Sequence, residues 1–212
     1  MIYKVEDITQ AKYSPELFEQ AYNAMSSDRR QKADKLRFDE DKRLCVFSDM
    51  MLREMLREAA GIASPRFTRE ENGKPYLAGR EVHFNISHSK SFIACAVDSS
   101  PIGIDVEAVR LVHNRLLRRV CTQEELCFVT GSKEPPSASE HLSEEESLRF
   151  LQVWTAKEAY IKYTGKGLGT ELTSFSTAED GRLKTRLAPD LKLLNFVTAE
   201  YILSIVSEAS EQ

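Results

Sequence analysis

The sequence predicts a mixed α+β protein made of two similar α/β halves, each a small β-sheet packed on a long helix. In both parts, an initial strand is followed by helices and then by further strands, the kind of internal repetition that points to related units. The halves also echo each other in sequence at a shift of roughly 109 residues. The matched positions are Phe92, Ile93 and Val97 against Tyr201, Ile202 and Val206. We place the boundary near Pro101, giving halves at residues 1–100 and 101–212.

The first half is expected to be helical near its start and β-rich near its end. Ser14 before Pro15 is typical of a helix N-terminus, and a basic helical stretch follows it. A long amphipathic helix is predicted at 40–60, where Gly61 ends it. Strands are then expected from 66–69 onward, with a turn at 72–73, where the residues are Asn and Gly.

Residues 83–98, HFNISHSKSFIACAVD, predict a pair of strands. Small polar residues interrupt the apolar pattern, so Ser87, His88 and Ser89 are expected at a turn between the strands. A histidine at a turn is ordinarily a hydrogen-bonded surface group. Flanked by two hydroxyls and Lys90, His88 is equally well placed to donate to a phosphate.

Two capping boxes organise the second half. Thr122 with Glu125 begins a short helix, and Ser143 with Glu146 begins a longer one that Gly165 ends. Three β-rich runs are expected after it, at 172–178, 183–187 and 191–206.

Composition excludes several classes of protein. The chain has 212 residues, 42% of them hydrophobic, and a net charge of −4, which argues against a general nucleic-acid binder. It contains no apolar run of about 20 residues and no signal arrangement at its start, so we expect a cytoplasmic protein without a membrane segment. The cysteines show no C-x-x-C spacing and are expected to be reduced thiols in apolar contexts, without a structural metal. They are Cys45, Cys95, Cys121 and Cys127.

Carboxylates and lysines in apolar surroundings mark the candidate site. Asp105 and Glu107 lie two residues apart in a β-branched run, so both side chains point to one face of a strand. Glu158 and Lys162 lie one turn apart on a helix. Each feature has an ordinary explanation, the outer face of an edge strand or a surface ion pair. Their apolar neighbours favour a functional site instead, in which a metal ion holds a polyphosphate.

Five ordered motifs over roughly residues 25 to 180 resemble those of a known family. G-x-D-x-E stands at Gly103, Asp105 and Glu107, and W-x-x-K-E-x-x-x-K at Trp154, Lys157, Glu158 and Lys162. HFNISHS at 83–89, GKP at 73–75 and GKGL at 165–168 complete the set. The chain is similar to 4′-phosphopantetheinyl transferases of the longer, surfactin-synthetase-activating type. That resemblance implies two α/β halves related by a pseudo-twofold axis, with the active site in the cleft between them, and a monomer.

The resemblance also implies the reaction and the ligands. A Mg²⁺ ion, with Mn²⁺ as a possible substitute, is expected on Asp105, Glu107 and Glu158, all hard oxygen ligands. The substrates implied are coenzyme A and an apo acyl or peptidyl carrier protein, whose serine hydroxyl receives the 4′-phosphopantetheine arm and displaces adenosine 3′,5′-bisphosphate. Residues matched to coenzyme A binding are Arg43, with Lys42 as its rival, Lys74, Pro75, Ser87, His88, Lys157 and Lys162.

Catalytic roles fall on Glu158, Lys162 and His88. Lys162 is expected to meet charge on the leaving phosphate, while Lys157 or His88 holds non-bridging oxygens. The general base is either Glu158 or a metal-bound water that Glu158 orients. Two alternatives remain: a Mg²⁺-dependent hydrolase of coenzyme A or a related nucleoside diphosphate compound, and a non-enzymatic coenzyme A-binding module. The sequence does not specify the carrier protein or its pathway.

Overall fold

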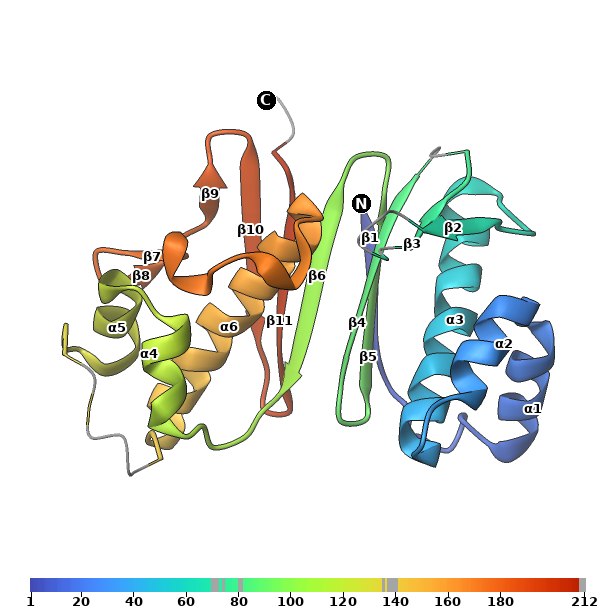
Figure 1. Ribbon diagram of the computed structural model, residues 1–212, viewed down its shortest axis with the longest axis horizontal. Coiled ribbons are helices and arrows are strands. Elements are labelled where there is room, and N and C mark those ends of the chain that lie inside the picture. Colours follow the sequence, from blue (N-terminus) through green and yellow to red (C-terminus); the bar gives the residue numbers. More distant parts are fainter. Residues whose placement is uncertain (70–72, 74, 80–81, 135, 137–140, 210–212) are drawn as a thin grey trace. The chain divides into compact units, whose positions relative to one another are not determined.

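The computed structural model describes all residues except 70–72, 74, 80–81, 135, 137–140 and 210–212. The chain divides into two compact units, Met1–Ser99 and Ser100–Gln212. Each unit combines antiparallel strands with one long helix, which confirms the predicted α+β class (Figure 1).

The first unit is a three-stranded antiparallel sheet covered by a helix. Its sheet has the order β1-β5-β4, with β5 in the centre, and the long helix α3 packs on β5. Helices α1 and α2 pack in turn on α3. The elements are β1 (Ile2–Asp7), α1 (Pro15–Ala24), α2 (Ser27–Asp34), α3 (Asp39–Ala60), β2 (Phe67–Arg69), β3 (Pro75–Leu77), β4 (His83–Ser89) and β5 (Phe92–Asp98).

The predicted helix boundaries of this unit are confirmed. The hydroxyl of Ser14 accepts a hydrogen bond from the backbone N–H of Leu17 and caps α1, as the Ser-Pro pair indicated. Gly61 ends α3 in the left-handed conformation, with φ of 68°. Between α3 and the sheet lies an apolar core that includes Phe47, Met55 and Ile93, all fully buried. Burying each such side chain contributes about 1.5–3 kcal/mol, so this core fixes the helix on the sheet.

The predicted turn at 87–89 is wrong. Ser87, His88 and Ser89 belong to β4, where they pair with residues of β5, and the turn lies two residues later at Lys90 and Ser91. Lys90 adopts a left-handed backbone, with φ of 49°. Pairing with β5, which is apolar except for Asp98, extends the strand through the polar residues, because a strand needs hydrogen-bonded neighbours more than it needs apolar side chains.

The second unit repeats this arrangement with one more strand. Its main sheet has the order β6-β11-β10-β9, in which β11 lies between β6 and β10, and α6 packs on β6 and β11. The elements are β6 (Ile102–Ala108), η1 (Asn114–Leu116), α4 (Leu117–Val120), α5 (Gln123–Thr130), α6 (Glu144–Thr164), η2 (Gly167–Gly169), η3 (Leu172–Ser174), β7 (Ala178–Glu179), β8 (Arg182–Leu183), β9 (Arg186–Ala188), β10 (Leu191–Val197) and β11 (Tyr201–Glu208).

Both capping boxes form as predicted, and Gly165 ends α6 with φ of 69°. Two expected β runs are partly wrong. Leu172–Ser174 is a 3₁₀ turn and only Ala178–Glu179 is a strand there, and residues 184–185 separate β8 from β9 within the run expected at 183–187. The internal sequence match falls on β5 and β11, each the strand that lies between two partners in its own sheet. No helix among the described residues is both long and apolar enough to cross a bilayer.

Candidate active site

Strand β6 presents Gly103, Asp105 and Glu107 on one face, because side chains on a strand alternate. Gly103 shows which element this face meets. A Cβ added there would lie 1.9 Å from the carbonyl oxygen of Ala159 and 2.5 Å from the backbone nitrogen of Tyr163, both on α6. The absence of a side chain at Gly103 therefore lets α6 approach β6 closely enough for its residues to reach Asp105 and Glu107.

Helix α6 carries three polar side chains at four-residue spacing, and therefore on one face, at Trp154, Glu158 and Lys162. The indole Nε1 of Trp154 donates to Oε1 of Glu107 over 3.2 Å. The ammonium of Lys162 donates to Oδ1 of Asp105 over 2.6 Å and to the carbonyl oxygen of Ile104 over 3.2 Å. The structure thus brings together the predicted residues of the second half, Lys157 excepted.

Glu158 lies between these two contacts on the helix. Among the described residues, its carboxylate forms no hydrogen bond or ion pair. Burial raises the pKa of Glu158, the neighbouring charges of Asp105 and Glu107 raise it further, and Lys162 partly offsets both. A half-buried carboxylate in this electrostatic setting can serve as a proton acceptor or as a ligand for a cation.

The three carboxylates suit a hard divalent cation by their donor chemistry, and their mutual effect on the pKa of Glu158 indicates that they share one site. They do not form a preassembled metal centre. Across the residues that the structure describes, no group of three or more His, Cys, Asp or Glu side chains is arranged to hold an ion. Asp105 and Glu107 are instead engaged by Lys162 and Trp154.

Lys157 does not fit the role that the resemblance implied. Its side chain is fully buried, and its ammonium donates to Oε2 of Glu125 at 2.9 Å and to the carbonyl oxygens of Leu172 at 2.5 Å and Phe175 at 2.6 Å. Three contacts use all three ammonium donors, so none is left for a phosphate. Burial lowers the pKa of Lys157, and the charge of Glu125 opposes this effect. We therefore assign Lys157 a structural role in place of phosphate binding.

Glu125 is the buried partner that sequence reasoning missed. Its Oε2 also accepts from the backbone N–H of Thr122 at 2.8 Å, and its Oε1 accepts from the backbone and hydroxyl of Thr177 at 2.7 and 2.9 Å. The capping box revealed only the first of these bonds. Together with the ion pair to Lys157, they tie α5, α6 and the segment before β7 to one carboxylate.

In the first unit, the predicted ligands lie on different elements. Ser87 and His88 are on β4, where Ser87 is buried and His88 is exposed, and Pro75 begins β3. Lys74 lies outside the described residues.

Arg43 has a local structural explanation. Its guanidinium donates to the carbonyl oxygens of Ile8 at 3.3 Å and Tyr13 at 3.1 Å, and it lies over the ring of Phe47. Its rival Lys42 forms an exposed ion pair with Asp34 at 3.0 Å. A contact between either residue and coenzyme A stays a prediction.

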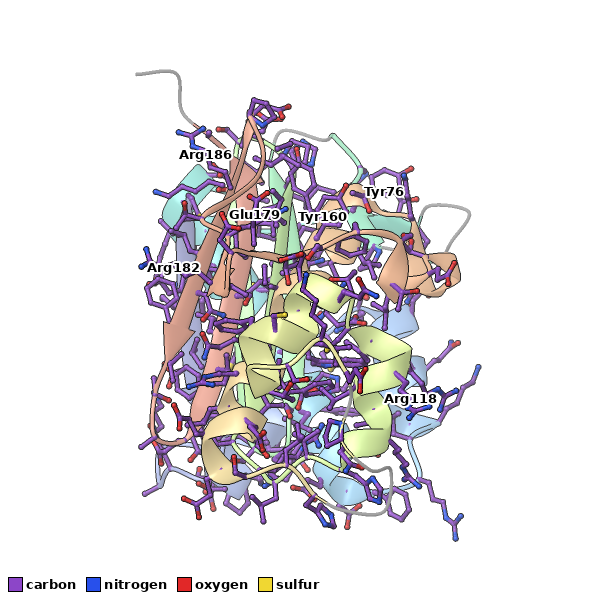
Figure 2. The ribbon with its side chains drawn as sticks, turned by 90° about the vertical axis from the view of Figure 1, so that its left-hand side faces the viewer. Tyr76, Arg118, Tyr160, Glu179, Arg182 and Arg186 are labelled. Atoms are coloured by element: carbon purple, nitrogen blue, oxygen red, sulfur yellow. The ribbon has the colours of Figure 1, made fainter. Side chains whose placement is uncertain are left out.

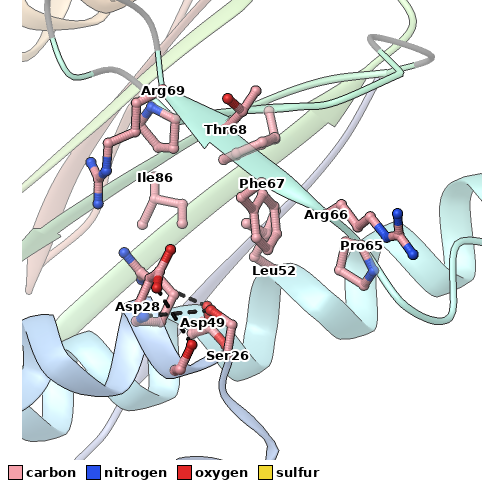
Figure 3. Close-up of a pocket in the computed structure, with 14 residues that line it drawn as sticks. Ser26, Asp28, Asp49, Leu52, Pro65, Arg66, Phe67, Thr68, Arg69 and Ile86 are labelled. Atoms are coloured by element: carbon pink, nitrogen blue, oxygen red, sulfur yellow. Dashed lines mark hydrogen bonds and ion pairs between the residues drawn. The ribbon is translucent and has the colours of Figure 1, made fainter.

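A cavity of about 560 Å³ in the first unit is lined by other basic residues, among them Arg29, Arg66 and Arg69, together with Pro75 (Figure 3). Asp49, which is almost completely buried, accepts from Nε of Arg29 at 3.0 Å and from Nε of Arg53 at 2.6 Å. Arg29 belongs to the basic helical stretch that the sequence predicted, now α2, but the sequence did not show that this residue faces a cavity. Three further arginines on and beside α4, Arg115, Arg118 and Arg119, are solvent-exposed, and Arg118 points outward (Figure 2).

Comparisons with known proteins identify the family of this chain. A model of the 4′-phosphopantetheinyl transferase superfamily matches residues 101–206, and a model of the N-terminal part of 4′-phosphopantetheinyl transferases matches residues 11–100. Three bacterial relatives are similar over most of their lengths. A 4′-phosphopantetheinyl transferase of Bacillus subtilis is 36% identical over 79% of this chain and 72% of its own. The 4′-phosphopantetheinyl transferase psf-1 of Bacillus pumilus is 31% identical over 81% of this chain and 72% of its own. The 4′-phosphopantetheinyl transferase Sfp of Bacillus subtilis strain 168 is 30% identical over 84% of this chain and 77% of its own.

These matches place the chain among the transferases. More particularly, the chain belongs to the 4′-phosphopantetheinyl transferase superfamily, as its motifs predicted.

Proposed function

We propose that this enzyme transfers the 4′-phosphopantetheine arm of coenzyme A to a serine hydroxyl of an apo acyl or peptidyl carrier protein, releasing adenosine 3′,5′-bisphosphate. The observation that carries the proposal is the stripe of Trp154, Glu158 and Lys162 on α6, which meets Asp105 and Glu107 of β6. Transfer of this kind depends on positioning and charge stabilisation, and both are provided by ionised side chains held on rigid elements.

We further propose that Asp105, Glu107 and Glu158 hold Mg²⁺, with Mn²⁺ able to replace it. When bound, the ion neutralises charge on the pyrophosphate of coenzyme A and polarises the phosphorus that is attacked. The raised pKa of Glu158 supports a second task, acceptance of the serine proton directly or through a water. Lys162 is proposed to stabilise charge on the leaving phosphate, and His88 to donate to a non-bridging oxygen.

The adenosine end of coenzyme A is assigned to the first unit. Ser87, Pro75 and Lys74 keep their proposed contacts, and the cavity with Arg29, Arg66 and Arg69 supplies the basic lining that phosphates require. Because Asp49 engages Nε of Arg29, the terminal nitrogens of that guanidinium are the donors we expect a phosphate to meet.

The enzyme is proposed to act as a cytoplasmic monomer. The four cysteines are free thiols, and Cys95 and Cys121 are buried, which a reducing compartment maintains. Light scattering at several dilutions, alongside transfer rates, tests the monomer: activity that falls together with loss of an oligomer contradicts it.

Intact-mass analysis tests the function. Apo carrier proteins of fatty-acid, polyketide and peptide synthesis are incubated with the enzyme, coenzyme A and Mg²⁺, and a mass gain of one phosphopantetheine arm is expected on at least one. A parallel sample without carrier measures coenzyme A turnover. Turnover there, with no mass gain on any carrier, identifies a hydrolase and overturns the proposal, and no change in either sample leaves a binding module.

A further inference from the structure

Lys162 occupies the position of a counter-ion among the acids. Its ammonium lies 2.6 Å from Oδ1 of Asp105, and the two side chains are 26% and 7% exposed. A second bond to the carbonyl oxygen of Ile104 anchors the same ammonium to β6. Two acceptors on one strand therefore hold the lysine in place, so the contact with Asp105 is built into the packing of α6 on β6.

The other acid of β6 is also engaged from within its own unit. Trp154 donates to Oε1 of Glu107, and the guanidinium of Arg110 lies 3.9 Å from Oε2. Glu158 lies between Trp154 and Lys162 on the helix. The negative charges of Asp105 and Glu107 raise its pKa, and the positive charge of Lys162 lowers it. The ammonium thus supplies positive charge at the same carboxylates that suit a divalent ion.

A divalent ion and the ammonium of Lys162 compete for this site. Both cannot contact Asp105 at close range without strong repulsion, since like charges at about 4 Å repel by several kcal/mol in a partly buried setting. Release of Lys162 from Oδ1 of Asp105 therefore favours binding of an ion at the same carboxylate. The long, flexible lysine side chain can move a few ångströms, and the departing ammonium needs an anionic acceptor.

We propose that Lys162, by pairing with Asp105, hinders metal binding until substrate is present. A phosphate of the substrate then takes the place of Asp105 as the partner of Lys162, so that the divalent cation and the polyphosphate bind together. This inference rests on the proposed function and adds regulation to its site. It explains why the described acids are not preassembled as a metal centre. The ammonium also offsets part of the negative charge of the three carboxylates while no substrate is present, which limits the repulsion that would otherwise loosen α6 from β6.

Binding of Mn²⁺, followed by its electron paramagnetic resonance signal, tests the coupling without any turnover. The wild-type protein is titrated with Mn²⁺ alone and in the presence of coenzyme A, and a Lys162→Met variant is titrated in the same two ways. Methionine keeps the length and apolar body of the lysine but removes its charge. Lys192→Met, at an exposed position of β10, is the matched control, and thermal melts verify that each variant is folded.

We expect coenzyme A to strengthen Mn²⁺ binding to the wild type and to the Lys192→Met control. In Lys162→Met, binding of Mn²⁺ alone should be about tenfold tighter than in the wild type, because the competing charge is gone, and coenzyme A should add less. Equal or weaker binding of Mn²⁺ alone to a folded Lys162→Met protein overturns the inference. Absence of any Mn²⁺ binding to the wild type, with or without coenzyme A, instead overturns the proposed metal site.

Discussion

Two lysines of helix α6, five positions apart in one sequence motif, form two different ion pairs. The pair of Lys157 with Glu125 is fully buried and every ammonium donor has a protein acceptor. The pair of Lys162 with Asp105 is partly exposed and lies beside two more carboxylates. A buried pair whose donors are all used holds elements together, whereas a pair with excess like charge around it can exchange its partner.

The largest expected effect on stability comes from breaking the buried ion pair of Lys157 with Glu125. Lys157→Met leaves Glu125 as a buried charge without its cation and should lower the free energy of unfolding by about 3–5 kcal/mol. Chemical denaturation measures this. Lys157→Met combined with Glu125→Gln should recover part of the loss, because the buried charge is then removed as well. A single variant within about 0.5 kcal/mol of the wild type would show that the two pairs do not differ as described.

Breaking the partly exposed pair of Lys162 with Asp105 should change the transfer rate and leave the stability of the fold almost unchanged. Asp105→Ala removes one proposed ligand and the partner of Lys162, so the single-turnover transfer rate should fall at least about a hundredfold, equivalent to about 2.7 kcal/mol. The melting temperature should change little, and coenzyme A binding should weaken less than the rate. Asp190→Ala, at an exposed position before β10, is the control and should transfer normally. Near-normal transfer by a folded Asp105→Ala protein with excess Mg²⁺ argues for a structural carboxylate.

The close approach of α6 to β6 lets Lys162 reach Asp105, and a substitution at Gly103 tests this packing. In Gly103→Ala the added Cβ meets the backbone of Ala159 at 1.9 Å, so the helix must shift; we expect about 1–3 kcal/mol of lost stability and a lower transfer rate. Gly169→Ala introduces the same methyl group where nothing lies within 4 Å and should change stability by about 0.5 kcal/mol or less. Similar melting temperatures for the two variants would contradict this packing.

The smallest expected change in stability concerns Glu158 and its dependence on pH. Its folded-state pKa lies above its ordinary value of 4.5, so the folded protein holds this proton more tightly than the unfolded chain. Its contribution to stability is therefore present below about pH 4.5 and is lost as pH rises through the raised pKa. Glu158→Gln cannot lose a proton, so its melting temperature should rise relative to the wild type as pH increases over this range, while transfer collapses. A difference that is independent of pH would exclude the proposed charge repulsion.

The transfer rate of a double variant tests whether Glu158 and Lys162 act on one transition state. Glu158→Gln and Lys162→Ala should each reduce single-turnover transfer, and their combination should cost less than the product of the two if both serve one transition state. An ordinary surface pair one helical turn apart predicts the opposite result, a loss of a few tenths of a kcal/mol in stability with transfer intact.

Local chemistry in the sequence determined most of the elements. The Ser14 cap, both capping boxes and the helix-ending Gly61 and Gly165 are formed by neighbours within a few residues, and so they were predictable. The alternation that puts Asp105 and Glu107 on one face, and the turn that puts Glu158 near Lys162, are equally local. Five ordered motifs also determined the family.

Only tertiary structure decided which charged groups are buried. Lys157 and Lys162 look alike in sequence, and the one that saturates its donors does so through residues 15 to 32 positions away along the chain, Leu172, Phe175 and Glu125. The turn after β4 moved because pairing with β5 extends a strand past polar residues. Arg29 faces a cavity, whereas Arg43 braces the chain at Ile8 and Tyr13. For the lysines and arginines the deciding interaction is long-range, and desolvation, which depends on the packed surroundings, sets whether a charge supports the fold or remains available for chemistry.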